Sequence, residues 1–416
     1  MDIFHDVEIL CQSAKRASRS LAMASEKKKN NLLLTLAELL TKRSEEIIAA
    51  NSTDLALAEE NGVPRAMLDR LMIDEGRIDG IAASLRSVAS LEDPIGKGEV
   101  WSRPSGITLR RIRVPLGVVG IIYEARPNVT VDSAALCLKT GNAVVLRGGK
   151  EAINTNIALV NVIKEALEAC GLDTGAVELI TSTSRESANA LMSMRGLVDV
   201  LIPRGGKGLI KSCVENSRVP VIETGAGNCH LYVDESADLD KALRVAVNAK
   251  CSRPSVCNAI ETILVHSSVA SEFLPMLKKA LDEYRVDIRG CERSRAILDG
   301  ISAATSVDFD TEFDDYIVAL GIVDSLEDAI EHINKYSTGH SEAIITENMK
   351  NADKFSAMID SVAVYVNAST RFTDGGEFGF GAEIGISTQK LHVRGPMGLS
   401  ALTTEKYLIS GDGAVR

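Results

Sequence analysis

Residues 117–148 read GVVGIIYEARPNVTVDSAALCLKTGNAVVLRG, and this segment predicts the fold class. Its two ends, GVVGIIYE and AVVLRG, are apolar and largely β-branched, as expected for strands covered on both faces. Between them, the segment from Asp132 to Thr140 is predicted to be a helix that ends at Gly141 and Asn142, a common helix stop. A strand, a helix and a second strand in this order predict a parallel β-α-β unit.

The same alternation continues toward the C-terminus and predicts an α/β fold with two doubly wound domains. In the first domain, AVELITS, VDVLIP and PVIET follow as strands with helices between them. A second series starts near Cys229, with strands at HLYVD, AIETILV, IVALGIV, EAIITEN and SVAVYVN. Strands that alternate with long helices form largely parallel sheets with helices on both faces.

The first hundred residues follow a different pattern. Apolar residues at three- and four-residue spacing predict helices over residues 5–24, 26–60 and 64–91. Ser52 and Asp54 are interpreted as caps at a break within this helical segment. The next stretch, WSRPSGITLRRIRV (101–114), alternates apolar and basic residues and predicts an exposed two-stranded element. That element is either a surface hairpin or a strand pair that binds a partner subunit.

Composition excludes several classes of protein. A chain of 416 residues exceeds the size at which one core keeps growing, so two or three domains are expected. The formal net charge of −11 argues against a nucleic-acid or membrane-surface role. No signal peptide and no membrane-spanning run is expected. The eight cysteines form no C-x-x-C pair, so no metal is expected, and the thiols are expected to be reduced in a cytoplasmic protein.

Loops that follow predicted strands carry the candidate binding residues. In the loop after the first strand, Asn128 has an amide that suits a developing oxyanion, and Arg126 suits an anionic substrate group. The alternative for Asn128 is a cap on the following helix. Two further loops, residues 147–150 and 204–207, both read RGGK. Their glycines let the backbone approach a phosphate at a helix N-terminus, although each is alternatively a plain turn.

Cys257 is the candidate nucleophile. It lies in RPSVCNAIETILV (253–265), directly before an apolar strand that holds a thiol rigidly and still leaves it open to a substrate. The alternative is a small core residue, because free cysteine is among the most buried residue types. Glu223, 34 residues earlier, is either a general base or a solvated carboxylate. His340 is either catalytic or a histidine that complements a helix dipole.

Together these residues resemble the aldehyde dehydrogenase superfamily. The similarity is closest to the branch that reduces glutamyl phosphate in proline biosynthesis, and it extends over nearly the whole chain. One departure is Ser255, where many relatives have glycine, but a small residue is kept. The segments that carry the resemblance are YEARPNVT (123–130), IPRGGKGLI (202–210), ETGAGNCH (223–230), RPSVCNAIETILV (253–265) and the long stretches 323–344 and 367–399.

The resemblance implies NADPH-dependent reduction of L-glutamate 5-phosphate to L-glutamate 5-semialdehyde, with release of phosphate. Cys257 is then the nucleophile that forms an enzyme thioester. Asn128 and the backbone N–H of Cys257 match the oxyanion hole, and Glu312 matches the carboxylate that binds the nicotinamide ribose. Glu223 matches the superfamily's general base, but its role stays open because reduction needs no activated water.

By the same resemblance, Arg147, Lys150, Gly205 and Gly206 bind the cofactor. Lys150 stands where NAD-preferring relatives have a carboxylate, and a cation there suits the 2′-phosphate of NADP(H). The substrate has two anionic ends that require cations. The residues assigned to the substrate are Arg126, Arg253, His340 and Arg371.

The resemblance also implies domain boundaries and an assembly. The expected assembly is a homodimer or homotetramer, with substrate supplied by glutamate 5-kinase. Two other interpretations stay open: an oxidising NAD(P)-dependent aldehyde dehydrogenase with Glu223 as general base, and a catalytically silent protein that keeps the fold. The expected domains are a cofactor domain (1–100 and 118–228), a catalytic domain (229–366, to about 384) and an oligomerisation flap (101–117 and 385–416).

Overall fold

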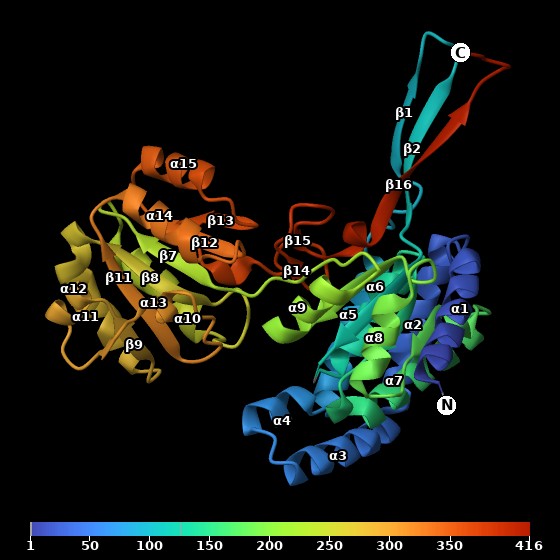
Figure 1. Cartoon of the computed structure of the whole chain (residues 1–416), viewed down its shortest axis with the longest axis horizontal. Coiled ribbons are helices and arrows are strands. Elements are labelled where there is room, and N and C mark those ends of the chain that lie inside the picture. The colour runs from blue at the N-terminus through green and yellow to red at the C-terminus, as the bar shows by residue number, and fades with distance from the viewer. Residues whose placement is uncertain (1, 125) are drawn as a thin grey trace. The chain divides into compact units, whose positions relative to one another are not determined.

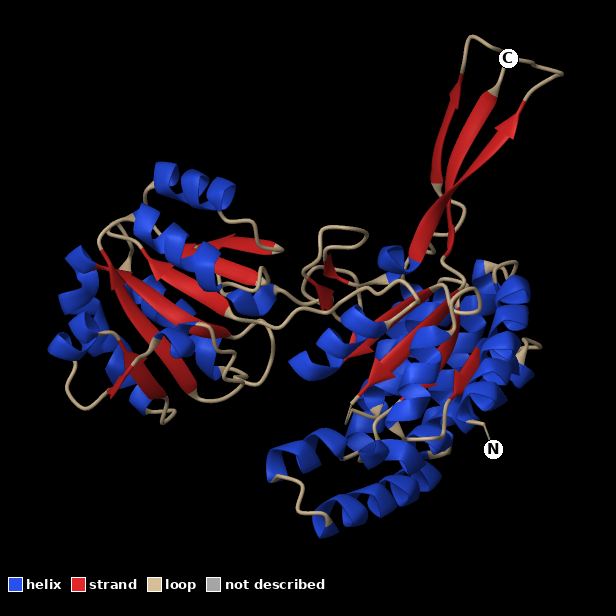
Figure 2. Ribbon diagram, viewed as in Figure 1, coloured by secondary structure: helices blue, strands red, loops and turns tan. Residues whose placement is uncertain are grey.

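The computed structural model describes residues 2–124 and 126–416, except for the side chains of residues 65 and 66. The chain forms two compact units, each with its own parallel sheet and covering helices (Figure 1, Figure 2). The predicted fold class, two doubly wound α/β domains with a small additional sheet, is confirmed. The first unit comprises Met1–Thr224, Gly379–Gly385 and Met397–Arg416, and the second comprises Gly225–Phe378 and Ile386–Pro396.

The first unit begins with the helices α1 (Ile3–Leu21), α2 (Glu26–Lys42), α3 (Ser44–Glu60), α4 (Arg65–Leu71) and α5 (Glu75–Ser90). The predicted break at Ser52 and Asp54 is wrong, because α2 ends at Lys42 and both residues lie inside α3. Asp54 is buried, and its carboxylate accepts hydrogen bonds from the backbone N–H groups of Asn154 and Thr155. These two residues begin α7 (Ile153–Ala169). A residue that looks like a cap in its own helix therefore caps another one.

A four-stranded parallel sheet forms the centre of the first unit, in the order β5-β4-β3-β6. Its strands are β3 (Val118–Tyr123), β4 (Ala143–Arg147), β5 (Val177–Leu179) and β6 (Val200–Arg204). Every residue of β3 is buried, as a strand covered on both faces requires. The expected strand PVIET joins this sheet only through an isolated bridge between Leu201 and Val221. The connecting helices are α6 (Asn128–Lys139), α7, α8 (Arg185–Ser193) and α9 (Lys207–Asn216), with short 3-10 turns at Lys150–Ala152 and Thr174–Ala176.

A seven-stranded parallel sheet forms the centre of the second unit, in the order β10-β9-β11-β8-β7-β12-β13. Every residue of β8 (Ile260–His266) is buried, so the strand that follows Cys257 is a rigid support. The other strands are β7 (Cys229–Val233), β9 (Asp287–Gly290), β10 (Ser302–Ala303), β11 (Ile317–Val323), β12 (Ser341–Ile345) and β13 (Ala363–Val366). The helices are α10 (Leu239–Cys251), α11 (Ser267–Asp282), α12 (Glu292–Ile297), α13 (Ser306–Phe309), α14 (Leu326–Tyr336) and α15 (Met349–Met358).

The chain's C-terminal part is divided between the two units. A 3-10 turn at Thr370–Phe372 and the short pair β14 (Ile386–Ser387) and β15 (Gly395–Pro396) belong to the second unit. A 3-10 turn at Leu399–Leu402 then leads into β16 (Thr403–Ser410) of the first.

A three-stranded antiparallel sheet extends away from the helices of the first unit (Figure 1). It contains β1 (Gly98–Ser102), β2 (Thr108–Pro115) and β16, in the order β1-β2-β16. The predicted two-stranded element is thus completed by the C-terminal segment. Trp101 packs edge-on against Tyr407, with ring centroids 6.2 Å apart. Across the described ranges, no helix combines the length and apolar character needed to cross a membrane.

Candidate functional site

The residues expected in the site are divided between the two units. The second unit contains Cys257, the expected nucleophile, and Glu312, which is expected at the ribose. It also contains three residues assigned to the substrate: Arg253, His340 and Arg371. Asn128, Glu223 and both RGGK loops lie in the first unit.

Cys257 lies in the turn between α10 and β8 and is half-buried. Gly227 packs directly against its backbone: a Cβ atom at position 227 would lie 1.6 Å from the carbonyl oxygen of Cys257. Only glycine permits this approach. The turn that contains Cys257 is therefore supported by the backbone of Gly227.

Glu312 supports the same segment. Its Oε1 accepts a hydrogen bond from the backbone N–H of Gly227 at 2.6 Å. The residue expected at the nicotinamide ribose thus holds the glycine that packs against Cys257.

Two arginines lie near Cys257. Arg371 donates from Nε to Ser252 Oγ at 3.0 Å and from Nη1 to the side-chain oxygen of Asn258, the residue after Cys257. Burial lowers the pKa of Arg371, and the neighbouring guanidinium of Arg253 lowers it further. Two neighbouring guanidinium groups repel each other, and an anion bound between them near Cys257 would relieve that repulsion.

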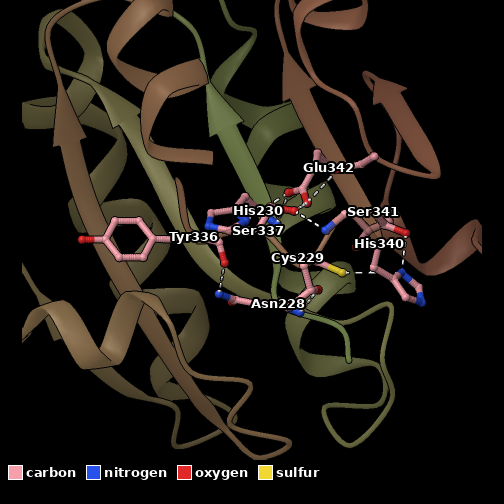
Figure 3. Close-up of polar contacts among 12 residues, drawn as sticks. Asn228, Cys229, His230, Tyr336, Ser337, His340, Ser341 and Glu342 are labelled. Carbon is pink, nitrogen blue, oxygen red and sulfur yellow. Dashed lines mark hydrogen bonds and ion pairs between the residues drawn. The ribbon is translucent and has the colours of Figure 1, made fainter. Parts of the chain in front are cut away.

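His340 is fully buried and has no surface to offer a substrate. Its Nδ1 lies 2.8 Å from Ser341 Oγ and 3.8 Å from the sulfur of Cys229 (Figure 3). Burial lowers the pKa of His340 to about 4, so the ring is neutral at physiological pH. The structure therefore places His340 in the wall behind the Cys257 turn, whereas the sequence interpretation assigned it to the substrate.

In the first unit, Asn128 is exposed and begins α6. Its amide nitrogen donates to the carboxylate of Asp132 at 3.0 Å, one turn along the helix. No side-chain cap is formed at this helix start, so the capping alternative for Asn128 does not apply. Arg126 is half-buried in the loop just before.

The second RGGK loop leads into α9 and already binds an anionic group. The backbone N–H of Gly206 donates to Glu124 Oε2 at 2.9 Å, and a Cβ at Gly205 would lie 2.5 Å from the same oxygen. Helix N-termini attract negative charge through their free N–H groups. The carboxylate of Glu124 shows that this helix start accepts an anion, which fits the phosphate groups of a dinucleotide.

The first RGGK loop holds its two cations differently. Arg147 donates from Nη2 to the carbonyl oxygens of Thr183 (2.7 Å) and Ser184 (2.8 Å), and burial lowers its pKa. Its guanidinium therefore supports a neighbouring loop of the sheet edge. Lys150 is exposed, so its charge is available to solvent and to ligands.

Glu223 is half-buried and follows the short bridge that pairs Val221 with β6. The next residue, Thr224, donates from its hydroxyl to the carbonyl oxygen of Pro203 at 2.9 Å. The Glu223 turn is thus anchored to the end of β6, beside the second RGGK loop.

Sequence reasoning did not single out four residues that shape these surroundings: Glu124, Asp132, Cys229 and Thr370. Glu124, Cys229 and Thr370 contact partners that are 82, 28 and 112 residues away, which no local spacing rule links to them. Asp132 contacts Asn128 at the i,i+4 spacing of a helix, which could have indicated the pair. Glu124, Cys229 and Thr370 stand in the quoted segments 123–130, 223–230 and 367–399, and these segments were the available signal.

Comparison with known proteins supports the same assignment. The sequence profile of the aldehyde dehydrogenase family matches residues 4–293 and 316–387. The γ-glutamyl phosphate reductase of Moorella thermoacetica is 57% identical over 417 residues, which cover 100% of both chains. The crystal structure of γ-glutamyl phosphate reductase from Thermotoga maritima superposes with a TM-score of 0.96 at 48% identity, covering 99% of each chain. An acetylating aldehyde dehydrogenase from Geobacillus thermoglucosidasius shares the fold, with a TM-score of 0.72 at 19% identity over 100% of this chain and 98% of its own. The chain belongs to the aldehyde dehydrogenase family and, within it, to the γ-glutamyl phosphate reductases.

Proposed function

We propose that the chain catalyses the NADPH-dependent reduction of L-glutamate 5-phosphate to L-glutamate 5-semialdehyde, with release of phosphate, in proline biosynthesis. Full-length relatives that carry the name γ-glutamyl phosphate reductase support this substrate. The observation that carries the proposal is the position of the half-buried residue Cys257 beside the guanidinium groups of Arg253 and Arg371. An acyl phosphate needs this combination, because a nucleophile must meet a carbonyl whose leaving group is anionic.

The first chemical step is acyl transfer to Cys257. The sulfur forms a bond to the acyl carbon, the bond from that carbon to the phosphate oxygen breaks, and phosphate leaves. Cations near the thiol favour its thiolate form and stabilise the departing phosphate. We assign this role to Arg253 and Arg371, and we assign the oxyanion to the amide of Asn128 and the backbone N–H of Cys257.

The aldehyde dehydrogenase family implies a nicotinamide cofactor. We propose that its phosphates approach the N-terminus of α9, because helix N-termini attract anions and the N–H of Gly206 there donates to a carboxylate, that of Glu124. Exposed Lys150 suits a 2′-phosphate, so we propose NADP(H), with Arg147, Gly205 and Gly206 forming the surrounding loops and Glu312 at the ribose. When bound, the cofactor supplies the hydride that reduces the thioester.

We further propose that glutamate 5-kinase supplies the substrate and that the chain forms a homodimer or homotetramer. The three-stranded sheet supports the assembly, because β1 and β16 are edge strands. Val100 and Ile409 expose apolar side chains on them, at 65% and 62% relative exposure.

The decisive experiment measures NADPH consumption with freshly generated glutamyl phosphate, comparing wild type with Cys257→Ala. Activity in the wild type and none in the variant is expected. A second assay supplies glutamate 5-semialdehyde and NADP with or without phosphate or arsenate. Turnover that ignores the anion would overturn the proposal and favour an oxidising enzyme in which Glu223 activates water.

A further inference from the structure

We propose that Cys229 is a positioning residue for Cys257: its thiol donates a hydrogen bond to the backbone carbonyl of Cys257 and fixes the turn that presents the nucleophile. This inference rests on the proposed role of Cys257. Nothing in the spacing of the two cysteines, 28 residues apart, suggests it.

The contact is direct and buried. Cys229 is the first residue of β7, has no exposed surface, and places Sγ 3.1 Å from the carbonyl oxygen of Cys257. Gly227, two residues earlier, packs its backbone against the same carbonyl. The start of β7 therefore meets the Cys257 turn with one close backbone contact and one hydrogen bond.

Cys229 keeps its proton, as this role requires. Burial raises the pKa of its thiol well above the usual value, and the nearby carboxylate of Glu342 raises it further. A thiol carries a single proton, and the carbonyl at 3.1 Å is closer than His340 Nδ1 at 3.8 Å. The S–H group therefore points to Cys257, and Cys229 itself is not a nucleophile.

A chain of polar contacts begins at the sulfur of Cys229 with the buried residues His340 and Ser341 (Figure 3). Nδ1 of the neutral His340 ring contacts both the sulfur and Ser341 Oγ, and that hydroxyl is 2.6 Å from Thr373 Oγ1. Thr373 in turn contacts the hydroxyl of Tyr365 at 2.7 Å. Cys229, the donor to Cys257, is thus held in place by a connected series of polar contacts.

The next carbonyl along the turn is held in the same way. The hydroxyl of fully buried Thr370 donates to the carbonyl oxygen of Asn258 at 2.6 Å. With both carbonyls held by buried donors, the two peptide groups that follow Cys257 have fixed orientations. These orientations set the direction of the Cα–Cβ bond of Cys257, and Asn258 in turn accepts a hydrogen bond from Arg371. Small misplacements of a reacting atom slow an enzymatic step strongly.

The test compares three variants that separate the donor from the packing. Cys229→Ala removes both, Cys229→Val fills the space without a donor, and Cys229→Ser keeps a donor. We expect kcat to fall about tenfold in the Ala and Val variants, with the KM for glutamyl phosphate within about twofold, and to recover in the Ser variant. Cys11→Ala is the matched control, because Cys11 is an equally buried thiol in α1 of the first unit.

The outcomes are distinct. Wild-type kcat in Cys229→Val, or an equal loss in the Val and Ser variants, would overturn the positioning role. Cys257→Ala is assayed in parallel: if it stays active, the proposed function fails, and if it is inactive while Cys229→Val is normal, only this inference fails. Thermal midpoints of all variants show whether a loss of kcat merely follows a loss of folded protein.

Discussion

The amide of Asn128 donates to the carboxylate of Asp132 at 3.0 Å, so the residue assigned to the oxyanion is held by an acid one helical turn away. Burial raises the pKa of Asp132 from 3.8 to about 6, while the Asn128 amide and the charge of Arg204 counteract this rise. Asp132, which orients Asn128, is therefore ionised at neutral pH, and its ionisation in the folded chain lowers the free energy of unfolding.

This cost predicts a pH-dependent gain in stability for Asp132→Asn. Between about pH 4 and pH 6 the folded chain keeps a proton on Asp132 that the unfolded chain releases. The contribution of Asp132 to the free energy of unfolding of the wild type is therefore present at low pH and is lost as the pH rises. Asparagine cannot ionise and still offers an oxygen to Asn128. The variant should melt at a higher temperature than wild type at pH 8, and the difference should vanish near pH 4 in thermal denaturation. An equal shift at both pH values would contradict the burial of this acid.

Glu124 occupies the helix start that we assign to the cofactor phosphates. Its carboxylate accepts the N–H of Gly206 and places a negative charge where a second anion must approach. Glu124→Ala should therefore tighten NADPH binding about two- to fivefold, since a charge at a helix terminus is worth a fraction of a kcal/mol to about 1 kcal/mol. Fluorescence titration of NADPH measures this change. Glu186→Ala, which removes an acid from the first turn of α8, should leave the affinity unchanged.

Lys150 provides the test of cofactor choice. Its side chain is exposed at the start of the turn after β4, so a substitution there leaves the core intact. Lys150→Ala should raise the KM for NADPH about tenfold and leave the KM for NADH nearly unchanged, because only NADPH carries the 2′-phosphate. The matched control is Lys211→Ala, which removes an exposed lysine of α9. A similar rise for both cofactors would contradict a contact with the 2′-phosphate.

Arg371 is held by Ser252 and Asn258 in a geometry that only a guanidinium group provides. Arg371→Ala should raise the KM for glutamyl phosphate about tenfold or more, and Arg371→Lys should recover only part of the loss, because lysine lacks the planar fork. Steady-state kinetics with varied glutamyl phosphate measure both. Arg293→Ala removes an exposed ion pair with Asp324 in the same unit and should change neither KM nor kcat.

The sequence predicts the fold well because a parallel strand buried on both faces has a continuous run of apolar residues, as β3 and β8 do. It places Asp54 wrongly because the partner of that carboxylate begins a helix 100 residues later. His340 shows the same limit: its polar motif does not reveal that tertiary packing buries the ring completely. The charge of Arg147 is visible in the sequence, but its engagement with the carbonyls of residues 183 and 184 is not.

Gly227 joins two of these observations, because its N–H donates to Glu312 and its Cα faces the carbonyl of Cys257. A methyl group at Gly227 would overlap that backbone oxygen, and its nearest neighbours are all backbone atoms of Cys257, so no flexible side chain can move aside. Gly227→Ala should therefore lower kcat at least about 100-fold by displacing the nucleophile, and it should also lower the melting temperature.

The control for Gly227→Ala is Gly80→Ala in α5, where a Cβ meets nothing within 4 Å. That variant should keep full activity and gain up to about 1 kcal/mol of stability from the higher helix propensity of alanine. Activity assays and thermal denaturation of both variants check the pair. An active Gly227→Ala would mean that the Cys257 turn tolerates displacement, and it would contradict the rigid support that the contacts from Gly227, Cys229 and Thr370 describe.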